Sequence, residues 1–148
     1  PMSPTGFSLA VHNAISGPFT IARKDTSAVT SIAAMNGLLM QTLFEAVGQL
    51  QNKKRVLCVV YDVPRPACFK HYNVGEPTPY AIAFVVSNNS GGAYCLTHSS
   101  EPMSEAVPSE ASPINADMVN FLKLLNGVET KISIPVNGQS WQVSSRVD

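Results

Sequence analysis

Apolar residues recur along this chain in two spacings, and the change from one spacing to the other predicts alternating strands and helices. Val29–Ala34 and Arg55–Val63 are short β-branched runs, typical of strands buried on both faces. Between these runs lies an apolar stripe at helical spacing, made of Leu39, Leu43, Val47 and Leu50 and widened by Met40 and Phe44. The pattern predicts an interior helix capped by Asn36. Strand, helix and strand in this order indicate a parallel pair with a right-handed crossover.

Clusters of glycine, proline and asparagine predict where other elements end. A helix over Thr5–Ile15 would stop at Ser16–Pro18. The runs YAIAFVVSN and AYCLTHSS stand on either side of Asn88–Gly92, which predicts two antiparallel strands joined as a hairpin. Ser100–Pro113 is rich in Ser, Pro, Glu and Ala and predicts a loop.

The last part of the sequence predicts one helix and one hairpin. Helical spacing is kept by Met118, Phe121, Leu122 and Leu125, and Asn126-Gly127 supplies a stop. Lys131–Val136 and Ser140–Val147 are joined by Asn137-Gly138, a strong hairpin turn. The whole pattern is that of an α/β chain, and its length predicts a single domain over residues 1–148.

Charge and composition narrow the classes of partner. The 10 Lys and Arg balance the 10 Asp and Glu, so no strong field favours nucleic acid or an anionic membrane surface. Only 14% of residues are charged and 45% are apolar, which leaves a neutral surface open to a protein partner. Three cysteines make no disulfide framework, and the apolar runs are too short to span a bilayer, so we expect a cytoplasmic protein. The chain opens at Pro1, and we expect that it lacks its natural N-terminal segment.

Two Cys-x-x-His pairs raise the hypothesis of a metal site. Cys68 with His71 and Cys95 with His98 have ligand types that suit tetrahedral zinc. However, residues three apart on a strand point to opposite faces, which argues against a shared ion for the second pair. The alternative of a free-standing metal- or small-molecule-binding domain therefore stays open, and the favoured expectation is no metal.

Nucleophilic chemistry has few candidates. Cys58 lies in an apolar strand, where burial would make its thiol inert. A hydrolase using Ser31 or Cys68 remains open, although no Gly-x-Ser-x-Gly turn or phosphate loop is present. The predicted strand-to-helix turn is where many enzymes mount a nucleophile, yet an amide, Asn36, stands there.

The segment FSLAVHNAISGPFTIARKDTSAVTSIAAMNG resembles the β-ketoacyl synthase family, with a thiolase-like fold. The match runs through Asn13, Gly17 and Thr20-Ile21, and its extension without a gap places Asn36 where the synthases have their catalytic cysteine. SPTGFSLAVHNAISG is similar to the chain length factors of bacterial aryl polyene and related polyketide clusters, which lack a working cysteine.

The resemblance implies a thiolase-like layered half-domain, with a mixed sheet and a buried central helix. It implies a cytoplasmic, non-catalytic subunit without cofactor that forms a heterodimer with a catalytic ketosynthase and meets an acyl carrier protein through that complex. The strand before the turn would pair with the ketosynthase, and the acyl tunnel would be shaped nearby. The implied interface and tunnel residues are Phe7, Val11, His12, Val29, Thr30, Ser31, Ile32 and Met35. The synthase histidines that assist condensation come from a second half with no counterpart in this sequence, which also predicts no condensation.

Overall fold

The computed structural model describes residues 3–8, 11, 13–34, 37–64, 66–72, 78–88, 93–99 and 116–146, and for residues 7, 8 and 70–72 it describes the backbone alone. The chain divides into two compact units, Pro1–Met35 and Asn36–Asp148. Each unit is described by itself. The predicted loop Ser100–Pro113 lies outside the described residues.

The first unit contains two short helices, α1 (Pro4–Ser8) and α2 (Ser16–Arg23). The single helix predicted over Thr5–Ile15 is therefore wrong, because α1 ends at Ser8 and residues 13–15 form a turn. Proline is tolerated in the first turn of a helix, where its missing N–H is not needed, so Ser16–Pro18 starts a helix instead of ending one. The Ser16 hydroxyl donates a hydrogen bond to the Asn13 carbonyl at 2.7 Å and fixes this start.

The segment Val29–Ala34 is not a strand in this structure, which corrects the prediction of a central buried strand. Val29 is 52% exposed and Ile32 is 38% exposed. None of the described strands pairs with the segment. Strand preference largely reflects packing against neighbouring strands, so a β-branched run without a neighbour has no ladder to join.

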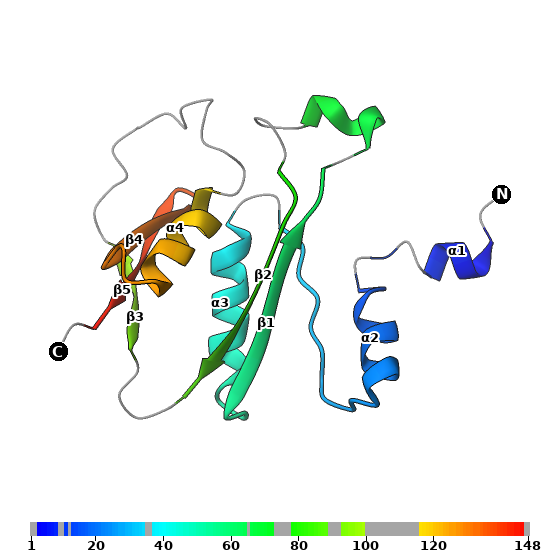
Figure 1. Cartoon of the computed structure of the whole chain (residues 1–148), viewed down its shortest axis with the longest axis horizontal. Coiled ribbons are helices and arrows are strands. Elements are labelled where there is room, and N and C mark those ends of the chain that lie inside the picture. Colours follow the sequence, from blue (N-terminus) through cyan, green and yellow to red (C-terminus); the bar gives the residue numbers. More distant parts are fainter. Residues whose placement is uncertain are drawn as a thin grey trace. The chain divides into compact units, whose positions relative to one another are not determined.

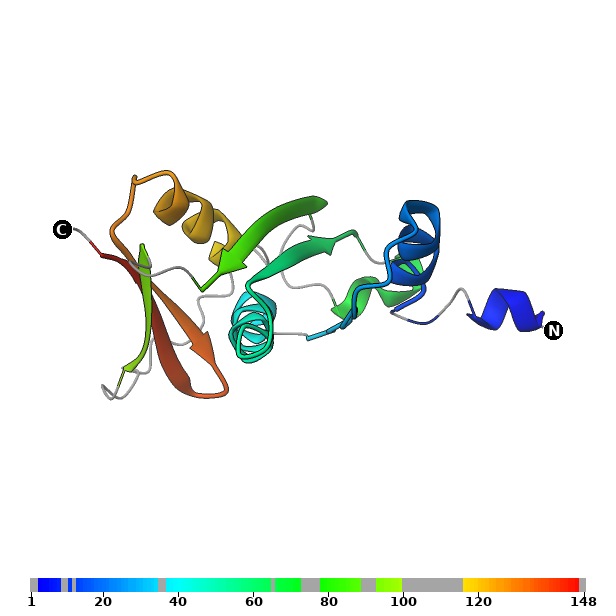
Figure 2. The same ribbon diagram turned by 90° about the horizontal axis from the view of Figure 1, so that it is seen from below.

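The second unit is a layered arrangement of two antiparallel sheets with two helices between them. Its elements are α3 (Leu38–Gln49), β1 (Arg55–Asp62), η1 (Ala67–Tyr72), β2 (Tyr80–Ser87), β3 (Tyr94–Ser99), α4 (Ala116–Leu125), β4 (Lys131–Val136) and β5 (Gln139–Ser145). One sheet is the ribbon β1-β2, and the other has the order β3-β5-β4. Figures 1 and 2 both show α3 and α4 between the ribbon and the three-stranded sheet.

The strand partners differ from those predicted. β1 pairs antiparallel with β2, from Arg55 opposite Ser87 to Asp62 opposite Tyr80, so the expected parallel pair is not found among the described residues. β2 and β3 were expected to form one hairpin, but they belong to different sheets. The residue patterns of β2 and β3 are typical of strands. Such a pattern does not determine which strand will be the neighbour.

The ribbon has one covered face and one open face. Cys58 and Val60 are buried on the inner side of β1, whereas Leu57, Val59 and Tyr61 alternate with them and are exposed. The apolar run of β1 was predicted to be buried on both faces. The described residues cover only one of these faces.

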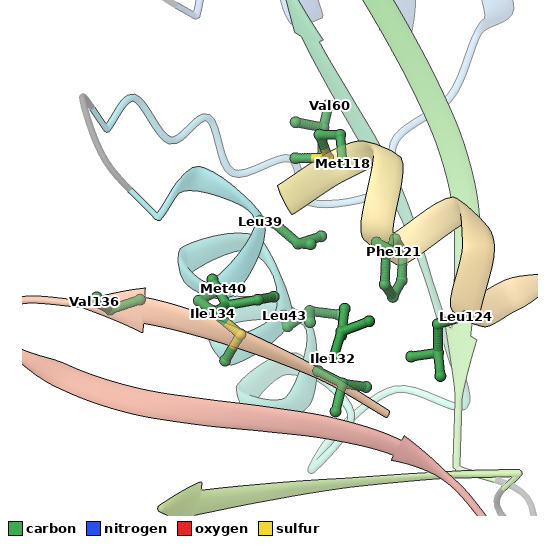
Figure 3. Packing of buried hydrophobic residues seen from close by; sticks show 11 residues of the cluster. Leu39, Met40, Leu43, Val60, Met118, Phe121, Leu124, Ile132, Ile134 and Val136 are labelled. Atoms are coloured by element: carbon green, nitrogen blue, oxygen red, sulfur yellow. The ribbon is translucent and has the colours of Figure 1, made fainter. Parts of the chain in front are cut away.

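The core of this unit is built from both helices and both sheets. Its buried side chains are Leu39, Met40, Leu43, Val60, Met118, Phe121, Leu124, Ile132, Ile134, Val136 and Val143, most of which are labelled in Figure 3. Aromatic pairs tie the layers together: Phe44 of α3 meets Trp141 of β5 edge to face at 4.7 Å between ring centroids. Phe84 of β2 meets Phe121 of α4 at 5.1 Å. The helices thus connect the two sheets through apolar contacts.

The predicted end of α4 and the predicted closing hairpin β4-β5 are confirmed. Gly127 has φ +71, and the Val128 N–H donates to the Lys123 carbonyl at 2.9 Å, which is the Schellman ending of α4. Asn137 and Gly138 both have positive φ, as a two-residue type I′ turn requires. Pro135 is accommodated because β4 is an edge strand.

Two leucines of α4 provide a matched test of the core. Leu124 is 1% exposed and Leu122 is 42% exposed. Leu124→Ala is expected to lower the free energy of unfolding by about 2–5 kcal/mol, because it leaves a cavity between the sheets. Leu122→Ala, with the same change in helix preference, should cost about 1 kcal/mol or less. Urea denaturation measures both, and equal losses would contradict this packing.

Candidate functional site at the start of α3

The first turn of α3 begins at a glycine with an unusual backbone conformation. Gly37 is the N-cap residue with φ +66 and ψ +27, a left-handed conformation that favours glycine. Its carbonyl accepts the first helical hydrogen bond, from the Gln41 N–H at 3.0 Å. The other N–H groups of the first turn have no partner within the helix, so this end favours negative charge at the residues just before it.

Gly37 also lies against the end of β4. A Cβ built at residue 37 would be 2.8 Å from Val136 Cγ2, closer than real carbon atoms approach. Val136 is buried, and Figure 3 labels it on β4. Glycine at residue 37 is therefore favoured for two independent reasons, its positive φ and the close approach of Val136.

The core side of α3 holds this first turn in place. Leu39 and Met40, the second and third residues of the helix, are almost completely buried. The Thr42 hydroxyl donates to the Leu38 carbonyl at 2.8 Å on the more open side. A helix start with such buried neighbours can shift little without disturbing the core.

The predicted interface and tunnel residues are only partly described. Asn36, Met35 and His12 lie outside the described residues, and Phe7 is described by its backbone in α1 alone. The other predicted positions belong to the first unit: Val11, Val29, Thr30 and Ile32 are exposed and Ser31 is half-buried. The assignment of these residues to an interface or tunnel stays a prediction.

The cysteines differ in environment. Cys58 is buried on β1, and burial raises the pKa of its thiol. Cys68 is exposed on η1 and Cys95 is half-buried on β3. His98 packs edge to face against Trp141 at 5.0 Å. Because Cys95 and His98 are three residues apart on a regular strand, they lie on opposite faces, as the sequence predicted.

No group of three or more His, Cys, Asp and Glu side chains in the described part of the chain could hold a metal ion. The side chain of His71, a member of the alternative zinc set, lies outside that part. None of the helices among the described residues is long and apolar enough to cross a membrane.

A second polar feature lies where α4 begins. Burial raises the pKa of Asp117 above its ordinary value. Burial also raises the pKa of Tyr80 on β2, and the carboxylates of Asp62 and Asp117 add to this rise. The Asp117 carboxylate thus acts electrostatically on Tyr80, in a part of the unit where ionisation is unfavourable.

The family model described as "Beta-ketoacyl synthase, N-terminal domain" matches residues 1–144. The chain belongs to the β-ketoacyl synthase family. The resemblance found in the N-terminal segment is thereby confirmed, and the match extends over almost the whole sequence. No curated protein matches this synthase-family chain.

One solved structure supports the fold. It is described as a ketosynthase (ApeO) in complex with its chain length factor (ApeC) from Xenorhabdus doucetiae. A chain of that structure superposes with a TM-score of 0.74 at 23% sequence identity, over 97% of this chain. The α/β thiolase-like ketosynthase fold is confirmed. The synthase-family chain spans 58% of the length of that relative.

The contact between Gly37 and Val136 was missed by the sequence reasoning. The sequence predicted Asn36 as the helix cap, but the N-cap residue is Gly37, whose positive φ was not predicted. The partner could not be found in this way, because Val136 reads in the sequence as an ordinary inward residue of a closing hairpin.

Two glycines of this helix region give opposite expectations. Gly37→Ala should lower the free energy of unfolding by about 1–3 kcal/mol, since it combines positive φ with the contact to Val136. Gly48→Ala, within α3 with nothing within 4 Å of the added Cβ, should raise it by about 0.5–1 kcal/mol. Chemical denaturation measures both, and a neutral Gly37→Ala would contradict the geometry.

The raised pKa of Asp117 predicts a pH dependence. The folded state binds the proton more tightly than the unfolded state, so stability falls as pH rises from 3.8 through the folded pKa. Asp117→Asn should therefore raise the urea midpoint at pH 7, with a smaller gain near pH 4. Glu129→Gln removes the same charge at an exposed position and should change the midpoint little. A gain that does not depend on pH would refute the assignment.

Proposed function

We propose that this chain is a non-catalytic partner of a ketosynthase, a chain length factor that shapes the acyl tunnel in bacterial aryl polyene, polyketide or fatty-acid-like biosynthesis. The observation that carries the proposal is the residue before the N-cap of α3. Gly37 begins the helix, and Asn36 precedes it where the family resemblance places the nucleophilic cysteine. A thiolate there would be stabilised by the helix N-terminus, whereas an amide nitrogen is not a nucleophile.

The remaining cysteines do not replace the missing thiol. Cys58 is buried, with a raised pKa that disfavours the thiolate. Cys68 and Cys95 lie on η1 and β3, in other elements than α3. The chain therefore offers no thiol at the start of this helix, and condensation would be left to the partner subunit.

Pairing with a ketosynthase is supported by the relative and by the first unit. The solved relative comes from a complex of a ketosynthase with its chain length factor. In this chain, Val29–Ala34 is a β-branched segment that exposes Val29 and Ile32. Such a segment can gain order by adding to a sheet edge of another protein, and we assign it, with Thr30 and Ser31, to the interface. An acyl carrier protein would meet this subunit through the complex.

A non-catalytic subunit can set product length by burial alone. Each methylene that enters an apolar tunnel gains about 0.8 kcal/mol, until a bulky side chain blocks further entry. We assign this limiting role to residues near the family's tunnel: Phe7, Val11, His12 and Met35. No cofactor is needed for such a role.

Co-expression with a ketosynthase from the same type of gene cluster tests the proposal. The wild-type chain should co-elute with the ketosynthase in size exclusion and change the length of its products. Phe7→Ala should lengthen these products, because a smaller side chain leaves room for more methylenes. Mass spectrometry of the released acyl chains measures the shift.

Phe69→Ala is the matched control, because Phe69 is an exposed phenylalanine on η1. It should leave pairing and product length unchanged. If the isolated chain were itself acylated and joined two acyl units, the non-catalytic role would be wrong. If no ketosynthase paired with it or changed products in its presence, the partner role would be wrong.

A further inference from the structure

The open face of the ribbon β1-β2 is apolar along its middle. It is formed by every second residue of β1 and by the residues paired with them on β2: Leu57, Val59, Tyr61, Ala81, Ala83 and Val85. The four larger side chains of this set are between 44% and 60% exposed. The pair Arg55 and Ser87 lies at one end of the face, outside its apolar part. An apolar sheet face that the described residues leave uncovered is typical of a surface where another protein packs.

The two strands give the open face one raised row and one low row. On β1 all three side chains of the face are large, whereas on β2 two of the three are alanine. Tyr61 is opposite Ala81, and Val59 is opposite Ala83. An alanine side chain ends at Cβ, so the row on β2 is lower than the row on β1 over most of the face. A surface with one raised row beside one low row is complementary in shape to a second copy of itself.

Only one two-fold arrangement uses this shape. An axis parallel to the strands places the raised row of each copy over the low row of the other, with Tyr61 over Ala81 and Val59 over Ala83. An axis across the strands would place raised row on raised row and leave both low rows unfilled. Two apolar sheet faces commonly pack in this way, with interdigitating side chains, and two-fold dimers are the commonest oligomers.

The charges of the chain permit such a pairing and predict its dependence on salt. The 10 Lys and Arg balance the 10 Asp and Glu, so two copies carry no net charge that would drive them apart. With the axis parallel to the strands, the same ends of the two ribbons meet, and the Arg55 side chains of both copies lie at one end of the interface. Their repulsion is local, and salt screens it.

We propose that the open face of the ribbon is a self-pairing surface, through which two copies of this chain form a two-fold dimer. This inference goes beyond the proposed function and does not depend on it. Each strand has eight residues, which makes the face roughly 27 Å long. A face of this length on only two strands is smaller than the roughly 800 Å² per partner of a standard interface. We therefore expect a weak dimer, with a Kd of about 10–100 µM.

Sedimentation equilibrium of the full chain tests the proposal. The wild-type mass should rise from that of a monomer to that of a dimer between about 5 and 200 µM. Val59→Lys should keep the chain monomeric, because it would bury a charge in the middle of the interface. Val119→Lys is the matched control, since Val119 is a similarly exposed valine on α4, and it should dimerise like the wild type. A monomeric wild type at the highest concentration, or equal dimerisation of both variants, would overturn the proposal.

Ala83→Leu separates a fitted interface from general apolar adhesion. The substitution adds apolar surface, so unspecific association would become stronger. In the proposed dimer the new side chain fills the low row and collides with Val59 of the other copy, so the Kd should rise about tenfold. Circular dichroism establishes that the variant is folded. Tighter association of Ala83→Leu than of the wild type would contradict the proposed fit.

Salt tests the arrangement without any substitution. Wild-type association should strengthen from about 50 to 500 mM NaCl, because the two Arg55 side chains then repel each other less. Weakening by salt would overturn the parallel-axis dimer.

Another occupant of the face would give a different set of results. The wild type alone would stay monomeric, and Val59→Lys, but not Val119→Lys, would lose co-elution with the ketosynthase. Self-pairing would then be wrong while the proposed function held. Conversely, a dimer that forms as expected would stand even if no ketosynthase paired with the chain.

Discussion

The apolar packing of α3 between two separate sheets is the interaction on which the second unit depends. The ribbon β1-β2 and the sheet β3-β5-β4 are distinct hydrogen-bonded sheets. What joins them is the buried surface of α3 and α4. Leu39 and Met40 lie near the start of α3, and Phe44 of the same helix packs against Trp141 of β5. Because these contacts are non-directional, the helices can be held firmly only if the side chains fit closely.

This constraint reaches directly to the candidate site. Leu39 and Met40 in the first turn of α3 are buried in the core, and Val136 packs against Gly37 at its start. The free N–H groups of that turn therefore have fixed directions relative to the core. The proposed function assigns to this end of the helix a role in the shape of a cavity or an interface, and a rigid support suits that role.

The sequence predicted correctly those turns and helix ends that depend on residues close together in the chain. Gly127 ended α4, and Asn137-Gly138 closed the β4-β5 hairpin, because both need positive φ at residues that tolerate it. The identity of strand neighbours could not be predicted in this way. β2 and β3 looked like a hairpin but entered different sheets, since the pairing is decided by packing against α3 and α4, which lie far away in sequence. Ser16–Pro18 misled for a related reason: the same residues can stop one helix or start the next.

The preference for glycine at residue 37 arises from packing and backbone conformation and not from any catalytic step. Its positive φ and its contact with Val136 are packing demands, and they would hold whether residue 36 were a cysteine or an asparagine. The retention of a synthase-like turn is therefore not an argument for catalysis. The core of the fold sets the start of α3, and this packing does not depend on the chemistry of the residue that precedes it.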